Sequence, residues 1–274
     1  RLGIFALWLL YFRGIRYVIT EHWSRYLPVT GTYNGFWRSV LTKLVVKNAF
    51  AVSTVSKNLA EAMQNHGLIN NHYMILPNVV DTDAYIPSEI KSSGSIKRFV
   101  HISCFEDRSK NISGLLQVTA KLLASRSDFE LIMVGEGLDL EKMKLLAMEL
   151  GLKEPHLKFT GLLENEALIS AYQSADFMVM FSNYENMPVV ISESFSCGLP
   201  VVATKVGGIA EYVNHANGRL VAAGDETALF EAINFMLDNC EMFDRSQIRK
   251  SAIEIFSKQA VADKLAELYK YALH

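Results

Sequence analysis

Short apolar runs alternate with amphipathic segments along the whole of this 274-residue chain. The apolar runs are bounded by Gly, Pro, Asn or Asp and predict buried strands at 16–20, 51–55, 73–76, 99–103, 129–134, 157–160, 177–181, 199–204 and 218–222. The amphipathic segments predict helices at 2–12, 36–50, 59–66, 112–125, 138–150, 165–174, 189–197, 225–238 and 258–274. Because strands alternate with helices and hairpin signals are lacking, we expect an α/β fold with parallel sheets.

One segment interrupts this alternation. Residues 86–97 are rich in Pro, Ser and Gly, which is the composition of a linker. We therefore expect a first domain over residues 1–80, a connection over 81–98 and a second domain over 99–257. The amphipathic segment 258–274 is predicted to form a final helix.

The totals exclude some classes of protein. Half of the residues are hydrophobic, enough for a substantial core, and the formal net charge of −2 argues against a nucleic-acid-binding protein with a broad cationic surface. The cysteines are widely spaced and lack metal-ligand spacing, which favours a reducing cytoplasm. The longest N-terminal apolar run, 4–12, has about half of the ~20 residues that a membrane-spanning helix needs.

The most informative stretch runs from Phe181 to Glu211 and completes a strand–loop–helix–strand unit. Glu185 lies in the loop and Glu193 in the helix, with Pro188 at the expected first helical position. At roughly 1.5 Å of rise per helical residue, plus the loop, we expect about 10 Å between the two carboxylates. This separation is too large for a shared-proton dyad or a common metal. It suits two hydroxyl-bearing groups on either side of a diphosphate, which the free N–H groups of the helix start would bind.

For an isolated glutamate pair, two solvated side chains would be the simpler interpretation, but the flanking sequence changes the balance. Glu-x7-Glu begins at a strand end, has Pro at the helix start and is followed by Cys-Gly-Leu-Pro-Val-Val-Ala-Thr. This compound motif resembles the donor-site signature of retaining GT-B glycosyltransferases of the "glycosyl transferases group 1" type (family 4). The segment 77–81, Pro-Asn-Val-Val-Asp, resembles the crossover between the two domains of these enzymes. Gly207-Gly208 with Glu211 resembles their turn after the second strand.

The resemblance implies a GT-B fold with two Rossmann-like domains, each with a parallel sheet, and an incomplete first domain. Residues 1–80 would be the later half of the N-terminal, acceptor-side domain, and 99–257 would bind the nucleotide-sugar donor. The helix 258–274 would return toward the first domain. The chain begins with Arg1 inside a predicted helix, so we expect it to be part of a longer protein.

The resemblance also implies roles for individual residues. Glu185 would hold the donor sugar, Glu193 the ribose hydroxyls and Lys110 the leaving diphosphate, while His22 would position a sugar hydroxyl or the acceptor. For His22, a purely structural role is an equal alternative. Further nucleotide-sugar contacts would come from Asn186, Met187, Pro188, Val189, Gly161 and Leu163.

The loop that carries Lys110 departs from the family pattern. These enzymes usually have an Arg five or six positions before the Lys, where this chain has Phe105 and Cys104. Arg108 is close enough in sequence to supply the missing cation, and a solvated Arg108 is the alternative. We expect neither a metal nor a cofactor: Asp81-Thr82-Asp83 has the form of a metal-binding motif but lies in the crossover.

The function that follows from the resemblance is sugar transfer from a nucleoside-diphosphate sugar to a glycan or lipid-linked glycan, with retention of configuration. A sugar-nucleotide 2-epimerase of the same fold and a non-catalytic nucleotide-sugar-binding module are alternatives. We expect a cytoplasmic protein. The helix 36–50 carries Arg38, Lys43 and Lys47, which could contact anionic lipid at the inner face of a membrane, although a solvated face is the simpler interpretation.

Overall fold

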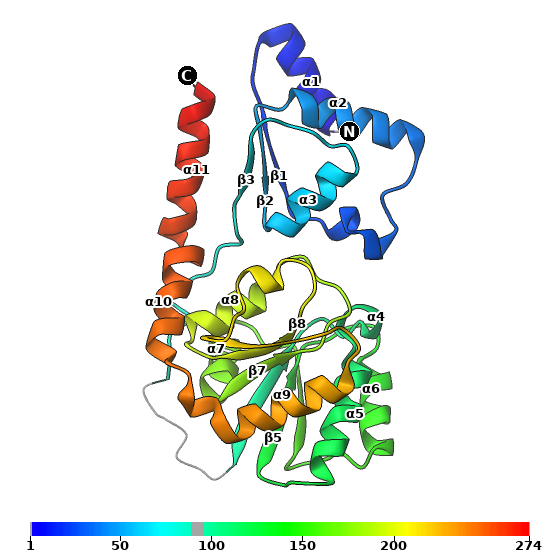
Figure 1. Ribbon diagram of the computed structural model, residues 1–274, viewed down its shortest axis with the longest axis vertical. Coiled ribbons are helices and arrows are strands. Elements are labelled where there is room, and N and C mark those ends of the chain that lie inside the picture. Colours follow the sequence, from blue (N-terminus) through cyan, green and yellow to red (C-terminus); the bar gives the residue numbers. More distant parts are fainter. Residues whose placement is uncertain (1, 89–95, 274) are drawn as a thin grey trace. The chain divides into compact units, whose positions relative to one another are not determined.

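The structure is a computed structural model that describes residues 2–88 and 96–273 (Figure 1). It divides into two compact units, Arg1–Val79 with Lys258–His274 and Val80–Ser257, and each has its own sheet. Most of the predicted linker, namely residues 89–95, lies outside the described residues. Among the helices described, none combines the length and apolarity needed to cross a membrane.

The smaller unit is built on a parallel sheet ordered β1-β2-β3. Its strands are β1 (Val18–Glu21), β2 (Ala51–Thr54) and β3 (Tyr73–Ile75). Its helices are α1 (Leu2–Arg13), α2 (Phe36–Asn48), α3 (Lys57–Asn65) and α11 (Lys258–Leu273), with 3-10 turns at Ser24–Tyr26 and Pro28–Thr30. Every strand predicted for this part of the chain is confirmed. Ser56 caps α3 as its sequence position predicts, since its side chain accepts a hydrogen bond from the Leu59 N–H at 3.1 Å.

The larger unit is built on a six-stranded parallel sheet. Its strands are β4 (Lys97–Ile102), β5 (Phe129–Val134), β6 (Leu157–Gly161), β7 (Phe177–Met180), β8 (Val201–Thr204) and β9 (Gly218–Val221). Its helices are α4 (Asp107–Lys110), α5 (Ile112–Leu123), α6 (Leu140–Glu149), α7 (Asn165–Ser174), α8 (Val189–Ser196), α9 (Glu226–Asn239) and α10 (Arg245–Phe256). Short 3-10 turns lie at Ile209–Glu211 and Cys240–Met242.

The sequence predicts each strand of the larger unit but neither α4 nor α10. A single four-residue turn such as α4 is too short to show a helical period. In α10 most positions are polar, and its buried side chains are Ile248, Ala252 and Phe256, a narrow stripe at every fourth position. Pro188 is also one position off: it is the N-cap of α8, with ψ at 127°, and Val189 is the first helical residue.

The core of the larger unit explains why its strands read as continuous apolar runs. Alternate residues of the strands, such as Phe99, Phe129 and Phe177, share one face of the sheet and pack with side chains from α5, α6 and α9. The rings of Phe99 and Phe177 are stacked with their centroids 5.2 Å apart. All four residues of β7 are buried, since both faces of a doubly covered parallel sheet are removed from water.

The strand order of this sheet is β6-β5-β4-β7-β8-β9. The chain therefore winds outward in one direction from β4 and in the opposite direction from β7, which is the doubly wound Rossmann order. β4 and β7 are neighbours, with Phe99 opposite Phe177 in the register. The loops that follow these two strands must diverge, and ligands of such sheets bind in the crevice outside the carboxyl ends at this switch point.

Candidate active site

The loops after β4 and β7 are tied together at the switch point. The backbone N–H of Asn183 donates to the carbonyl oxygen of Ser109 at 2.8 Å, and the Asn183 amide donates to the carbonyl oxygen of Arg108 at 3.1 Å. These bonds bring α4, at the end of the first loop, against the start of the second. The two sequence stretches chosen for phosphate and sugar binding therefore form one continuous site within the larger unit.

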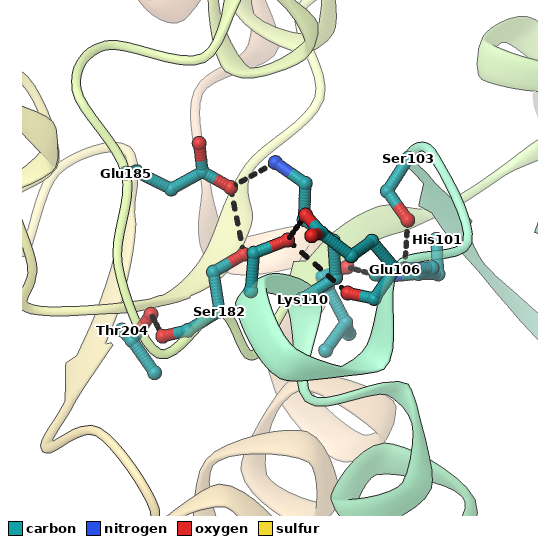
Figure 2. A network of polar contacts seen from close by, with 9 residues as sticks. His101, Ser103, Glu106, Lys110, Ser182, Glu185 and Thr204 are labelled. Carbon is teal, nitrogen blue, oxygen red and sulfur yellow. Dashed lines mark hydrogen bonds and ion pairs between the residues drawn. The ribbon is translucent and has the colours of Figure 1, made fainter. Parts of the chain in front are cut away.

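An ion pair between Lys110 and Glu185 lies across these loops. Figure 2 shows the two side chains pointing toward each other, and the Nζ atom of Lys110 is 2.5 Å from Oε1 of Glu185. The side chains are only 15% and 10% exposed, so each charge has lost much of its hydration and depends on the other. The two residues follow β4 and β7, at the carboxyl ends of the central strands.

Glu185 is held by a second partner from its own loop. The Ser182 hydroxyl donates to Oε1 of Glu185 at 2.8 Å, and the Thr204 hydroxyl donates to the Ser182 carbonyl oxygen at 2.7 Å (Figure 2). Ser182 and Thr204 are completely buried. Their bonds connect the carboxylate to the end of β8, so its rotamer is set by the sheet rather than by solvent.

The turn that carries Lys110 is also fixed. The N–H of Asp107 donates to Asp139, the carboxylate of Asp107 accepts from the N–H of Ser113, and the Ser109 hydroxyl donates to Glu106. Asn111 has a left-handed φ of 49°, which lets the chain stop α4 and start α5 at once. Lys110 is thus presented by a short rigid turn.

Gly207 allows the turn after β8 to approach the Glu185 loop. Its φ is 54°, and a Cβ at this position would lie 2.0 Å from the carbonyl oxygen of Glu185. The next residue, Gly208, donates its N–H to the carbonyl oxygen of Asn186 at 2.7 Å. The paired glycines expected from the sequence therefore hold the backbone on which Glu185 is mounted.

Glu193 occupies a separate, aromatic environment. The Tyr172 hydroxyl, from α7, donates to its Oε2 at 2.7 Å, and the ring of Tyr85 packs edge-on against Tyr172 with centroids 5.8 Å apart. Burial raises the pKa of Glu193, although hydrogen bonds from Tyr172 and Tyr85 oppose the shift. Glu185 and Glu193 have different hydrogen-bond partners and do not form a carboxylate dyad.

Arg249, from α10, holds Tyr85 in place. Its guanidinium donates to the carbonyl oxygens of Tyr85 at 2.7 Å, Ser196 at 2.6 Å and Thr82 at 3.0 Å. One side chain therefore attaches the 82–85 turn to the C-terminal end of α8, where a cation is favoured by the helix dipole. Sequence reasoning missed this residue together with the helix that carries it.

His101 is a buried histidine directly beneath the site. Its Nδ1 lies 3.0 Å from the carbonyl oxygen of Val179, which can only accept, so the proton is on Nδ1. Nε2 is then the acceptor for the Ser103 hydroxyl at 2.8 Å (Figure 2). Complete burial, together with the nearby positive charge of Lys110, lowers the pKa of His101 to about 4.

This neutral histidine makes stability depend on pH. The unfolded chain protonates His101 near its ordinary pKa of 6.5, whereas the folded chain resists protonation down to about 4, so folding stability is complete above pH 6.5 and is lost as the pH falls. Between pH 7 and pH 4.5 we expect protonation of this residue to remove about 2 kcal/mol from the unfolding free energy. Urea unfolding of the parent protein and of the His101→Gln variant at pH 7 and pH 4.5 measures this change in unfolding free energy. Equal pH dependence in the two proteins would contradict the assignment.

The remaining predicted donor residues lie on the same unit. Asn186, Pro188 and Val189 are partly accessible at the entry to α8, whereas the Met187 side chain is buried and could meet a ligand only through its backbone. Gly161 is the last residue of β6, at the edge of the sheet, and Leu163 lies in the segment that follows. The Gly161 carbonyl oxygen accepts a hydrogen bond from the Gly135 N–H at 2.9 Å. This bond connects the carboxyl ends of β5 and β6.

Two predicted residues are not part of the polar cluster around Lys110. Arg108 is exposed and, within the described residues, its guanidinium forms no hydrogen bond or ion pair; two positions apart on a helical turn, it and Lys110 do not face each other. Its role in place of the missing family Arg stays a prediction. His22 belongs to the smaller unit, directly after β1, where its Nδ1 lies 3.0 Å from Oδ1 of Asn78.

Sequence reasoning overlooked several supporting residues. Tyr172 looked like an ordinary apolar position of its helix, Tyr85 lay in the presumed connection, and His101 lay inside a strand. No spacing or motif distinguishes these residues, because their roles depend on contacts between segments far apart in the chain. Ser182 lies in the polar turn that the sequence does single out.

The larger unit is a doubly wound α/β domain, and its cluster of charged and polar side chains lies at the switch point of its sheet. Residues 88–254 match the sequence profile of the family described as "Glycosyl transferases group 1". The match covers more than half of the chain, so the chain belongs to the glycosyl transferases group 1 family. The family expected from the Glu-x7-Glu motif is confirmed.

Curated relatives agree with this assignment. The chain is 27% identical over 241 residues to N-acetyl-alpha-D-glucosaminyl L-malate synthase of Bacillus anthracis, covering 84% of this chain and 61% of the relative. It is 26% identical over 252 residues to D-inositol 3-phosphate glycosyltransferase of Corynebacterium jeikeium, covering 85% and 60%. The chain therefore spans about three-fifths of the length of these relatives.

Solved structures share the fold. Anabaena HepE in complex with UDP is similar with a TM-score of 0.84 at 21% identity, covering 98% of this chain and 76% of that protein. Sucrose-phosphate synthase from Thermosynechococcus elongatus has a TM-score of 0.81 at 21% identity, covering 99% and 71%. The predicted fold class, α/β of the GT-B type with parallel sheets, is confirmed.

Proposed function

We propose that the protein transfers a sugar from a nucleoside-diphosphate sugar to an acceptor hydroxyl, with retention of configuration. The observation that carries this proposal is the Lys110–Glu185 pair at the switch point, where a cation and a hydroxyl-binding carboxylate stand side by side. Anabaena HepE, which shares the fold, has been solved with UDP and with UDP-glucose. This supports a nucleotide sugar as the donor.

Lys110 is the group that would stabilise the leaving diphosphate. Bond cleavage at the sugar places negative charge on the diphosphate oxygens, and a fixed, partly dehydrated ammonium lowers the energy of that charge more than a mobile surface lysine would. The N–H groups of Val189 and Val190 precede the first hydrogen bond of α8, which runs from the Ile191 N–H to the Pro188 carbonyl oxygen at 3.2 Å, and they would bind the same oxygens. In this proposal the charge is carried by the protein itself, without a metal.

Glu185 would accept hydrogen bonds from hydroxyls of the donor sugar. Its Oε1 already accepts from Lys110 and Ser182, and a carboxylate has about four acceptor positions, so capacity remains for a ligand. The diphosphate would attract Lys110, which is the ion-pair partner of Glu185. Donor binding would therefore also affect the position of the Glu185 carboxylate. Glu185 therefore contributes chiefly to the reaction step.

Glu193 would bind the ribose hydroxyls. We expect Glu193→Gln to raise the donor dissociation constant by about 10- to 100-fold, the range for hydrogen bonds to a charged group, with turnover changed much less. Titration calorimetry with UDP and steady-state kinetics would check it. Glu149→Gln, at an exposed position of α6, is the control and should bind like the parent. A Glu193→Gln variant with parental affinity would remove Glu193 from the site.

The raised pKa of Glu193 gives this contact a pH dependence. The ionised carboxylate is the form that accepts two hydroxyls, and burial lets it take up a proton at a higher pH than an ordinary glutamate. Donor affinity should therefore fall as the pH drops through this raised pKa, and the Glu193→Gln variant should lack that part of the profile.

We propose a glycan or lipid-linked glycan as the acceptor, with His22 and the 23–35 segment of the smaller unit on the acceptor side. Relatives include N-acetylgalactosamine-N,N'-diacetylbacillosaminyl-diphospho-undecaprenol 4-alpha-N-acetylgalactosaminyltransferase of Campylobacter jejuni, 26% identical over 76% of this chain. A cytoplasmic location is proposed on the cysteines, all of which are free thiols.

The proposal is tested by a thermal-shift screen of UDP-, GDP- and ADP-sugars followed by product analysis. A bound donor raises the melting temperature by mass action. Transfer to an acceptor, or donor hydrolysis with release of the nucleoside diphosphate, would support the proposal. Conversion of the donor without acceptor to a 2-epimer would identify an epimerase, and binding without turnover a non-catalytic module; either result would overturn it.

A further inference from the structure

The outer face of α2 is apolar and basic, a combination that sugar transfer does not use. Its inner face is covered normally, with Val46 only 2% exposed. On the outer face, Phe36 and Trp37 are each 74% exposed, and Val40 and Leu44 are 42% and 44% exposed. An amphipathic helix of a water-soluble domain would have polar side chains at these positions. We define the surface formed by these four residues with Lys43 and Lys47 as the α2 face.

The charge distribution along the chain singles out the same region. Residues 1–60 hold eight Lys or Arg and one acidic residue, Glu21, a formal charge of +7. Since the whole chain carries −2, residues 61–274 carry −9. Neither α1 nor α2 contains an acidic residue. The exposed apolar side chains of α2 therefore lie in the one strongly cationic part of an otherwise acidic chain.

A groove runs along this helix within the smaller unit. It has a volume of about 660 Å³ and is lined by Val40, Leu44, Lys43 and Lys47 of α2 and by the segment 67–72. The end of Lys43 lies against the backbone of Gly67, since a Cβ on that glycine would be 3.1 Å from Nζ. The two lysines thus line a concave surface together with apolar side chains of α2 and with the polar residues Asn70, Asn71 and His72.

We propose that the α2 face binds to the surface of an anionic lipid bilayer. Exposed Phe and Trp rings partition into the interfacial region of a bilayer, Lys43 and Lys47 would pair with lipid phosphates, and the absence of acidic residues from α2 avoids repulsion. A second copy of the chain is the poorer partner, because two cationic faces would repel each other. The inference goes beyond the transfer reaction and does not depend on it.

Cosedimentation with vesicles tests the proposal. Phosphatidylcholine vesicles with and without 30% phosphatidylglycerol are the probes, at low and high salt. We expect binding to the anionic vesicles only, weakened by salt. Lys43→Glu with Lys47→Glu should reduce partitioning by at least about thirtyfold, because the loss of each cation near the surface costs roughly a factor of five and the new carboxylates are repelled by the lipid. Phe36→Ser with Trp37→Ser should also reduce it at least about tenfold.

Matched controls lie on the larger unit. Lys153→Glu with Lys158→Glu makes the same charge change at exposed positions, and Leu138→Ser removes a side chain that is 98% exposed. These variants should bind vesicles like the parent, and circular dichroism should show that all variants are folded. Equal binding to both vesicle types, or parental binding by either α2 variant, would overturn the proposal. The proposal would also be overturned if the protein did not bind vesicles but formed dimers at high concentration, and if replacing Trp37 abolished these dimers.

Discussion

Replacing Glu185 with Ala should lower turnover by at least about 100-fold, the scale on which a fixed electrostatic contact at a reacting centre contributes, while nucleotide affinity changes little. The reason is structural: Glu185 is held by Ser182 and paired with Lys110, so its removal leaves the ammonium without the partner that sets its position. Initial rates of donor hydrolysis or transfer, together with calorimetry using UDP, measure both parts of the expectation.

Three further variants make this result interpretable. Glu149→Ala removes an exposed carboxylate of α6, outside this cluster, and we expect close to parental rates. Lys110→Ala should be as damaging as Glu185→Ala, and the double variant should be little worse than either, because the two side chains act as a unit. Full activity in the Glu185 variant, or additive losses in the double variant, would show that the pair is only structural.

Gly207→Ala should destabilise the larger unit by at least about 3 kcal/mol and reduce activity with it. The new methyl group would lie 2.0 Å from the carbonyl oxygen of Glu185, so the turn and the glutamate loop could not both keep their places. Gly224→Ala is the control for backbone strain alone. Gly224 also has a left-handed φ, 75°, but a Cβ at this position would meet nothing within 4 Å.

Urea unfolding monitored by circular dichroism measures both variants. We expect the Gly224 variant to lose about 1 kcal/mol, the usual cost of a left-handed backbone conformation in a residue with a side chain. Equal decreases in unfolding free energy for the two variants would mean that the turn at Gly207 can shift to accommodate a methyl group. In that case the approach of Gly207 would not be what holds Glu185.

The fold was predictable because most of its information is local. The strands of the larger unit are short apolar runs bounded by turn residues, and Asp225 and Ser56 mark helix starts by capping with their own side chains. The switch point also follows from strand order once a parallel sheet is assumed. α10 was not predicted because only a narrow stripe of its side chains is apolar. Its contacts are with α8, and the sequence alone does not show that these two helices pack together.

The site was predictable only in part. Glu185, Glu193 and Lys110 stand in motifs, and the structure places Lys110 and Glu185 in direct contact. Their supports depend on the third dimension: the Tyr172 hydroxyl reaches Glu193 from α7, and Arg249 reaches the 82–85 turn from α10. A motif records which residue types recur at fixed spacing, whereas these partners come from segments whose separation in sequence carries no such constraint.

The cysteine that stands in place of the family Arg has a practical consequence for the loop after β4. Cys104 is exposed there, whereas Cys197 and Cys240 are only 1% and 2% exposed, and burial raises the pKa of both of these thiols. A maleimide dye should therefore attach to the native protein at one position, a few residues from Lys110. A fluorescent dye on Cys104 could therefore report binding of a nucleotide-sugar donor without an engineered cysteine.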